Sequence, residues 1–156
     1  MVSSSDIGVT GPWFEVPLER GKIREFARAI KAEMPEFLDE SRPSVPPTFL
    51  VTAGRFWGYT FDDPRETDLA KVDLDRSLLL HAEEEYEFFG PPPRAGTTLR
   101  ARTKIANVYE KEGRRGGKLI FVVAETEFQN EQGSTVAISR TTVVKTESAP
   151  STKEGP

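Results

Sequence analysis

The fold of this chain is decided by two stretches: Val45-Pro46-Pro47-Thr48-Phe49-Leu50, and Leu80-His81-Ala82-Glu83-Glu84-Glu85-Tyr86-Glu87-Phe88-Phe89. The first predicts the abrupt start of a buried helix, because proline suits the first helical turn, where its missing N–H would be unpaired anyway. The second alternates in character along its length, which is typical of a strand. An apolar helix followed by long strands predicts a sheet wrapped around a helix.

The rest of the chain supplies further helices and strands. A short strand is expected at residues 13–16, and a helix at 19–31 with an apolar stripe of Ile23, Phe26, Ala27 and Ile30. The buried helix is expected to begin at Pro46-Pro47 and to end near Gly58, and residues 60–76 read as an acidic loop. Strands are expected at 77–89, 97–109, 118–129 and 134–145, with hairpin turns between the last three. Helices followed by consecutive hairpins predict an antiparallel α+β domain.

Alternation assigns side chains to the two faces of each strand. In 77–89 one face carries Leu78, Leu80, Ala82, Glu84, Tyr86 and Phe88, and the other carries Leu79, His81, Glu83, Glu85 and Glu87. In the later strands the expected apolar positions are Leu99, Ala101, Ile105, Ile120, Val122, Ala124, Phe128, Val136, Ile138, Val143 and Val144. Glu84 is therefore expected to return to solvent through a bulge or local pairing, or to serve an active site or an interface. His81 is expected to be held by carboxylates or by a partner, with a catalytic role as the alternative.

Composition bounds the class of protein. The 156 residues suit one domain at 12–146, between a flexible N-terminal arm (1–11) and a disordered tail (147–156). A net charge of −4 argues against nucleic-acid binding. The absence of cysteine excludes disulfides and thiolate chemistry, and a single histidine excludes a multi-histidine metal site, so no metal or cofactor is expected. No apolar run approaches the ~20 residues of a membrane span, so a cytoplasmic protein is expected.

Four motifs, taken in order, carry a family resemblance: Ile23-Arg24-Glu25-Phe26-Ala27; Pro47-Thr48-Phe49; Leu80-His81 with Glu83, Glu85 and Glu87; and Pro93-Arg94-Ala95-Gly96. With them the chain resembles the MaoC-like dehydratases, and more narrowly their N-terminal-type half, the FAS1-like dehydratase domain. The resemblance covers roughly residues 12–146. It implies a hot-dog fold that pairs with a second hot-dog unit, as a homodimer or a heterodimer. It also implies a lyase of fatty acid metabolism that hydrates trans-2-enoyl thioesters of CoA or of an acyl carrier.

The resemblance further implies a catalytic Asp and His on the loop after the first helix. Here those positions hold Ala32 and Phe37, and neither can transfer a proton. The chain is therefore expected to be a non-catalytic, accessory subunit of a heteromeric (R)-specific enoyl-CoA hydratase, or 3-hydroxyacyl-thioester dehydratase, whose hot-dog partner carries the dyad. Two alternatives stay open: a stand-alone acyl-CoA thioesterase using Glu33 or Glu36 as base, and a non-enzymatic acyl-CoA binding module.

The substrate is expected to meet two groups of residues. The resemblance implies that backbone N–H groups at the start of the central helix polarise the thioester carbonyl, near Pro47, Thr48 and Phe49. Phe56 and Trp57 are expected in the core or along an acyl pocket. The basic row of Arg100, Arg102 and Lys104 reads as an exposed sheet face balanced by glutamates of a neighbouring strand, or as a seat for the phosphates of coenzyme A.

Overall fold

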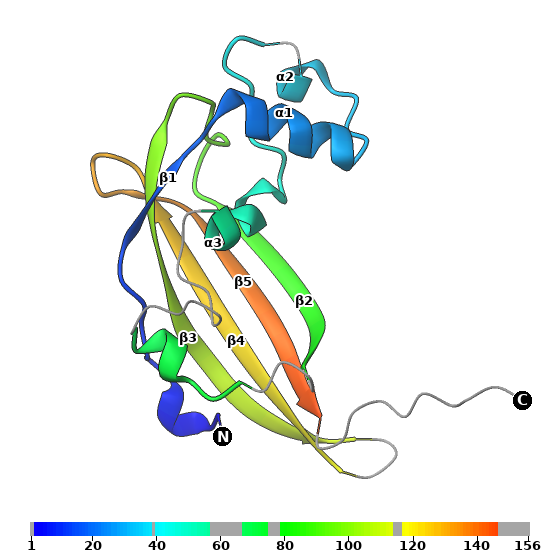
Figure 1. Cartoon of the computed structure of the whole chain (residues 1–156), viewed down its shortest axis with the longest axis vertical. Helices are drawn as coiled ribbons and strands as arrows, with labels where there is room; N and C mark the ends of the chain where they lie inside the picture. Colours follow the sequence, from blue (N-terminus) through cyan, green and yellow to red (C-terminus); the bar gives the residue numbers. More distant parts are fainter. Residues whose placement is uncertain (1, 39, 57–66, 75–78, 114–116, 147–156) are drawn as a thin grey trace, which may run out of the picture.

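A computed structural model of the chain describes residues 2–38, 40–56, 67–74, 79–113 and 117–146, and Figure 1 shows one curved sheet running along it. The strands are β1 (Phe14–Pro17), β2 (Leu79–Phe88), β3 (Thr98–Glu112), β4 (Lys118–Gln129) and β5 (Thr135–Thr146). They lie in the order β1-β3-β4-β5-β2, and every neighbouring pair is antiparallel. The predicted α+β class and the five predicted strands are confirmed, with ends shifted by a few residues. Several parts of the chain named above lie outside the described residues: Trp57, Leu78, the turn 114–116 and the tail 147–156. The side chains of Arg55 and Phe56 also lie outside them.

The helical segments are short and lie at the ends and on one face of the sheet (Figure 1). They are the 3₁₀ helices η1 (Ser4–Asp6), η2 (Phe49–Thr52) and η3 (Leu69–Lys71), and the α-helices α1 (Arg20–Ala29), α2 (Pro35–Leu38) and α3 (Ala53–Phe56). Helices α1 and α2 lie beyond one end of the sheet, and α3 lies over one face. None of the described helices is long and apolar enough to cross a membrane.

The core lies on one face of the sheet, here called the inner face. The strand register aligns Ala101, Phe128 and Ala137 across β3, β4 and β5, and all three are at most 1% exposed. Phe49 and Leu50 of η2 belong to the same buried cluster. The two alanines are small and leave room beside Phe128, so the side chain of Phe49 can pack closely against the inner face.

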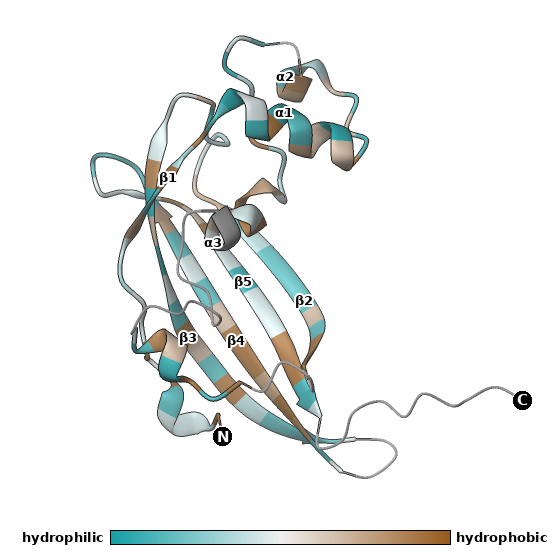
Figure 2. Cartoon of the chain, in the orientation of Figure 1, coloured by the Kyte–Doolittle hydropathy of each residue, from teal (hydrophilic) through white to brown (hydrophobic). Residues whose placement is uncertain are grey.

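In the first half of the last strand, the apolar positions expected from the sequence, Val136 and Ile138, do not lie on the inner face. Ala137 and Ser139 occupy the inner face and are 1% and 6% exposed, whereas Val136 is only partly buried and Ile138 is half-buried. Residues opposite each other in antiparallel strands share a face, and Phe128 pairs with Ala137. Val136 and Ile138 are therefore one position out of phase with the inner face, whereas Val143, which pairs with the buried Val122, lies on it. Figure 2 colours the polar and apolar positions along the strands.

The buried helix begins later than predicted. Val45 donates its N–H to the Pro93 carbonyl, and Phe49 donates to the Pro46 carbonyl, so the prolines form a turn before the helical segment instead of its first residues. The segment then opens as η2 and continues as α3. Phe49 and Leu50 are buried, but Val51 is 45% exposed, so the described part has a solvent-facing side. The expected end at Gly58 lies outside the described residues.

Helix α1 matches its prediction in position but not in all of its stripe. Ile23 and Ala27 are buried, Phe26 packs against the core, and Ile30 is 48% exposed because the helix ends just before it. The end has the pattern of a Schellman motif: Lys31 donates its N–H to the Arg28 carbonyl, and Ala32 donates to the Ala27 carbonyl. Lys31 has φ 56°, a left-handed conformation that normally falls to glycine.

The expected flexible arm is attached to the sheet over its described part. Val2 is 2% exposed and packs in a second buried cluster with residues such as Leu69 and Ile105. Gly8 donates its N–H to the Ile105 carbonyl, and Ile105 donates to the Val9 carbonyl. These main-chain bonds, and the bond from the Gly11 N–H to the Thr103 carbonyl, fix residues 8–11 along β3, so the expectation of a flexible arm is corrected there.

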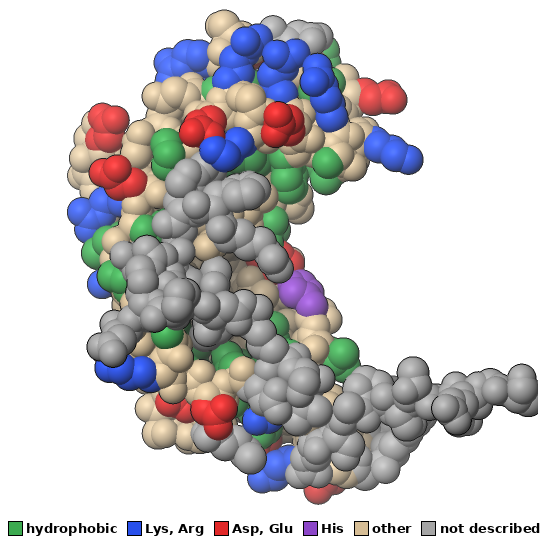
Figure 3. All heavy atoms as spheres, in the orientation of Figure 1, with side chains coloured by type: hydrophobic (Ala, Val, Ile, Leu, Met, Phe, Trp, Pro, Cys, Tyr) green, Lys and Arg blue, Asp and Glu red, His purple; other side chains and the backbone are tan. Residues whose placement is uncertain are grey.

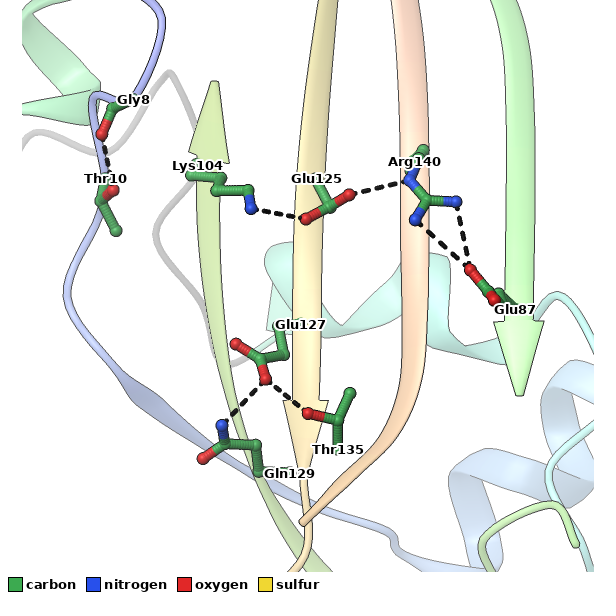
Figure 4. Close-up of polar contacts among 9 residues, drawn as sticks. All are labelled: Gly8, Thr10, Glu87, Lys104, Glu125, Glu127, Gln129, Thr135 and Arg140. Carbon is green, nitrogen blue, oxygen red and sulfur yellow. Dashed lines mark hydrogen bonds and ion pairs between the residues drawn. The ribbon is translucent and has the colours of Figure 1, made fainter. Parts of the chain in front are cut away.

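The opposite, outer face of the sheet is charged, and its ions pair across strands (Figure 4). Lys104 Nζ lies 2.8 Å from Glu125 Oε1, and Arg140 Nε lies 2.8 Å from Glu125 Oε2. Arg140 also contacts Glu85, at 2.6 Å, and Glu87, at 3.3 Å. Burial opposes ionisation of Glu125, but its hydrogen bonds with Lys104 and Arg140, and their charges, together hold the pKa of this carboxyl below its usual value.

Replacing Lys31 with glycine is expected to stabilise the protein. Glycine adopts the left-handed conformation without the Cβ clash, so the free energy of unfolding should rise by about 0.5–1 kcal/mol. Urea denaturation followed by circular dichroism measures it. Lys31→Ala is the matched control, because it removes the charge and keeps the Cβ. Equal gains in both variants would show that charge, not backbone conformation, is responsible.

Replacing Glu125 with glutamine is expected to cost about 1–2 kcal/mol at pH 7, because two charge-assisted contacts are weakened. The folded pKa of Glu125 is depressed, so its stabilisation is present above the unfolded pKa of about 4.3 and is lost as pH falls through the folded value. The difference between wild type and variant should therefore shrink below about pH 4. Urea denaturation at both pH values tests this, with Glu131→Gln in the exposed β4–β5 turn as control. An undiminished difference at low pH would contradict it.

Candidate functional site

The loop after α1, where the family resemblance places the catalytic dyad, contains no proton-transfer group at the two expected positions. Ala32 follows the helix end and is held by its N–H bond to the Ala27 carbonyl. Phe37 lies in α2 and donates its N–H to the Met34 carbonyl. Both side chains are half-buried. The structure thus holds a methyl and a phenyl group at these positions.

The carboxylates of this loop are exposed to solvent. Glu33 and Glu36 both face water, although the main-chain carbonyl of Glu36 accepts a hydrogen bond from the Ser44 N–H. The one histidine of the chain, His81, lies on β2, a separate element of the fold. The loop therefore does not combine a carboxylate with an imidazole.

The start of the central helical segment divides into an exposed and a buried part. Pro47 and Thr48 are exposed, whereas Phe49 is 1% exposed and meets the ring of Phe26 edge-on, with centroids 5.4 Å apart. Of the predicted contacts here, Pro47 and Thr48 are accessible to a ligand and Phe49 supports them from the core. The side chain of Phe56, and all of Trp57, lie outside the described residues.

The predicted basic row lies on the outer face, away from the side that carries η2. The guanidinium carbons of Arg100 and Arg102 lie 4.1 and 4.6 Å from the ring centre of Trp13, a cation–π arrangement, and Lys104 pairs with Glu125. The expectation that neighbouring glutamates balance this row is met at Lys104. The structure does not bring the row together with Pro47, Thr48 and Phe49.

A β-bulge in β2 changes which side chains share a face. His81 pairs with Val143 and Glu84 with Thr141, so one extra residue, Ala82, is accommodated between His81 and Glu83. Residues three apart in a regular strand point to opposite faces, but here their partners are two apart, so His81 and Glu84 share the inner face. The sequence assignment of His81 to the face of Glu83, Glu85 and Glu87 was wrong for this reason.

The bulge creates a polar group that we call the β2 cluster: His81, Glu84, Tyr86 and Thr141. Glu84 Oε2 accepts a hydrogen bond from Thr141 Oγ1 at 2.7 Å and lies 3.2 Å from His81 Nε2. Its other oxygen, Oε1, is buried and has no hydrogen-bond partner among the described residues. Burial, and then the negative charge of Glu84, hold the pKa of the Tyr86 hydroxyl well above its ordinary value. The prediction that Glu84 returns to solvent is corrected, since its side chain is only 16% exposed.

A row of hydroxyl groups continues from this cluster across the inner face. The register aligns Tyr86, Ser139, Thr126 and Thr103 across four strands, and the Thr103 and Thr126 hydroxyls lie 2.8 Å apart. The row lies between the residues of the two buried clusters, next to the line of Ala101, Phe128 and Ala137. The sequence analysis missed it, although Thr103 and Thr126 interrupt the apolar alternation of their strands.

The β2 cluster and the hydroxyl row offer donors and acceptors for a polar group that lies against the sheet. Glu84 and His81 also form a carboxylate–imidazole pair, the combination used for proton transfer at neutral pH. The side chain of His81 is 58% exposed. Figure 3 shows the histidine at the rim of a hollow between the helices at one end of the molecule and the sheet. Within the described ranges, no group of three or more histidine or carboxylate side chains could hold a metal ion.

Comparisons with solved structures show where this fold recurs. A C-terminally truncated HadBC (3R-hydroxyacyl-ACP dehydratase) complex from Mycobacterium tuberculosis has a chain similar over 89% of this chain and 98% of that one, with a TM-score of 0.65 and 24% identity. The ChsH1–ChsH2 complex of the same organism matches 94% of this chain and 89% of that one, with a TM-score of 0.65 and 15% identity. The (R)-hydratase of A. caviae matches over 91% and 98%, with a TM-score of 0.60 and 14% identity. At these identities the likeness shows the fold, which is the predicted hot-dog fold.

Sequence comparisons place the chain in a family. It is 33% identical over 92 residues to the UPF0336 protein PPA1896 of Cutibacterium acnes, a match that spans 58% of this chain and 60% of that relative. A family model described as "FAS1-like, dehydratase domain region" matches residues 5–139. Together with the sheet order and the structural likeness to MaoC-like dehydratases, this match confirms the predicted resemblance. The chain belongs to the FAS1-like dehydratase domain family, and its fold is the one found in the MaoC-like dehydratases.

Proposed function

We propose that the chain is the non-catalytic subunit of a heteromeric (R)-specific enoyl-CoA hydratase, or 3-hydroxyacyl-thioester dehydratase, in the cytoplasm. The observation that carries the proposal is the pair of side chains at the dyad positions, Ala32 and Phe37. Hydration of an enoyl thioester needs a base to activate water and an acid to protonate the α-carbon. A methyl and a phenyl group supply neither, so the partner subunit brings both.

Heteromeric assembly is supported by the structural neighbours. HadBC and ChsH1–ChsH2 are complexes named after two different chains each, and both resemble this chain along most of its length. The pairing of a chain that lacks the dyad with one that has it gives each subunit a distinct task. In this proposal the present chain completes the dimer and shapes the acyl-binding groove.

The proposed ligand is an acyl thioester, carried by coenzyme A or by an acyl carrier protein. The name of HadBC specifies a hydroxyacyl group on a carrier protein. Pro47 and Thr48 are exposed beside the first turn of η2, where main-chain N–H groups could polarise the thioester carbonyl. Phe49, Phe56 and Trp57 are proposed to support or line the acyl pocket. Arg100, Arg102 and Lys104 are the proposed seat of coenzyme A phosphates, reached from the outer face.

A second candidate, a stand-alone thioesterase, is favoured by the contact between His81 Nε2 and Glu84 Oε2. Here the base would be the β2 cluster instead of Glu33 or Glu36, since a carboxylate-held imidazole can activate water. This candidate requires thiol release by the chain alone. It makes no use of a partner's dyad.

Hydration is expected to depend on the partner. The chain alone should hydrate crotonyl-CoA and a longer enoyl-CoA at least about 100-fold more slowly than the chain co-expressed with a hot-dog protein that carries the Asp/His dyad, because general acid–base catalysis contributes about 10²–10⁴-fold. Loss of absorbance of the enoyl thioester measures the rate. Within the pair, Glu33→Gln and Glu36→Gln in this chain should leave the rate within about twofold. An ordinary turnover of about 1–10³ per second by the chain alone would overturn the proposal.

The thioesterase is tested by release of free coenzyme A from acetyl-CoA and a longer acyl-CoA. The chain contains no cysteine, so a thiol reagent reads the product without a background from the protein. The accessory-subunit proposal predicts no release above the uncatalysed rate. Release that is lost in His81→Ala and in Glu84→Gln, but kept in Glu33→Gln, would favour the second candidate.

A further inference from the structure

One buried carboxylate oxygen on the inner face lacks a hydrogen-bond donor. Glu84 Oε2 has two polar contacts, Thr141 Oγ1 at 2.7 Å and His81 Nε2 at 3.2 Å, whereas Oε1 of the same carboxylate has no partner among the described residues. Buried polar atoms of folded proteins are nearly always hydrogen-bonded, because otherwise the cost of removing them from water is not recovered. Glu84 Oε1 therefore calls for a donor that the described part of the chain does not supply.

A ligand can reach this carboxylate from the hollow above the sheet. The Glu84 side chain is 16% exposed, and the His81 side chain beside it lies at the rim of the hollow (Figure 3). The terminal torsion of a glutamate side chain has a broad energy profile, so a small rotation turns Oε1 toward an arriving donor. The unpaired oxygen is therefore within reach of a polar group that enters the hollow.

The neighbouring groups favour a hydroxyl as that donor. A hydroxyl both donates and accepts hydrogen bonds, whereas an ammonium group only donates. Burial, and then the negative charge of Glu84, raise the pKa of the Tyr86 phenol, so Tyr86 keeps its proton and can donate it to a ligand oxygen. Tyr86 forms no hydrogen bond of ordinary length with Glu84 Oε1. The β2 cluster thus contains an acceptor and a donor, which are the two complements of one hydroxyl group.

The inner face beside the cluster is polar where a groove for plain hydrocarbon would be apolar. The hydroxyl row runs across strands spaced about 4.8 Å apart and consists of Tyr86, Ser139, Thr126 and Thr103. The Thr103 and Thr126 hydroxyls pair with each other, so the unpaired oxygen lies at the β2 end of the row. Covering polar groups with hydrocarbon is costly, whereas a chain with its own hydroxyl restores a hydrogen bond.

We infer that Glu84 selects acyl thioesters whose chain carries a hydroxyl group, and that this hydroxyl donates a hydrogen bond to Glu84 Oε1. The inference rests on the proposed function and adds a substrate class to it. In the proposed complex the partner's dyad acts on the second and third carbons of the chain, so the hydroxyl bound by Glu84 lies on a carbon farther along. A site that pairs with a substrate hydroxyl discriminates against the analogue that lacks it, because the buried oxygen is then left unpaired.

Binding of unreactive ligands tests this preference. Isothermal titration calorimetry compares octanoyl-CoA with 6-hydroxyoctanoyl-CoA and 8-hydroxyoctanoyl-CoA, on the full chain and on its complex with the co-expressed dyad-carrying hot-dog protein. These saturated thioesters have no double bond to hydrate and no 3-hydroxyl to eliminate, and only the acyl hydroxyl differs among them. Wild type should bind at least one hydroxylated ligand about tenfold more tightly than octanoyl-CoA. Equal affinities for all three ligands, or no binding of any, would overturn the inference.

Two variants of Glu84 and one control locate the preference. In Glu84→Gln the carbonyl oxygen takes over the bond from Thr141, so an amide NH₂, which cannot accept, replaces Oε1. Glu84→Met removes both oxygens at similar volume. The preference should fall to within about twofold in both variants, with folding checked by circular dichroism. Glu83→Gln makes the same change at an exposed outer-face position and should keep the preference. A preference that survives in both Glu84 variants contradicts the inference.

The binding measurement is independent of the proposed function. A hydroxyl preference that is lost with Glu84 supports the inference even if the chain hydrates enoyl-CoA without a partner and the accessory role fails. Partner-dependent hydration without any hydroxyl preference overturns the inference and leaves the proposed function standing. Release of free coenzyme A during the titration, if it is lost in Glu84→Gln, would assign this residue to hydrolysis and would also overturn the inference.

Discussion

Burial of the inner face of the sheet is the constraint on which the rest of the structure depends. Phe49 and Leu50 join the same core as Ala101, Phe128 and Ala137, and the small side chains flanking Phe128 make this close approach possible. Because side chains alternate in a strand, the register that buries these residues also determines which groups face outward. The charged outer face and the polar inner-face positions are both consequences of this one alignment.

The bulge at Ala82 adds a second, local constraint. It places His81 beside Glu84 on the inner face and leaves Glu85 on the outer face beside Arg140, so one strand has two different polar surfaces. The inner surface carries the hydrogen bonds of Glu84, and the outer surface carries the ion pairs of Arg140 with Glu85 and Glu87.

The proposed accessory role rests on the side chains at two positions, Ala32 and Phe37, together with an intact fold around them. Helix α1 ends in a hydrogen-bonded motif through Ala32, and α2 carries Phe37, so the loop keeps a regular conformation while lacking the proton-transfer groups. In the proposed complex this chain contributes its sheet and its groove, while the partner subunit performs the chemistry.

The sequence by itself determined the five strands, helix α1, the α+β class and the family, because hydrophobic period, proline positions and turn residues are local signals. The prediction that Ala32 and Phe37 occupy the dyad positions also came from the sequence, through the family resemblance. Tertiary structure alone decided the face of His81, the burial of Ala137 ahead of Val136, and the attachment of residues 8–11 to β3. Each of these depends on pairing between segments that are distant in the chain. A single bulge exchanges the two faces for all residues of the strand beyond it. A small residue can be buried when the residue opposite it on the neighbouring strand has a large side chain that fills the space.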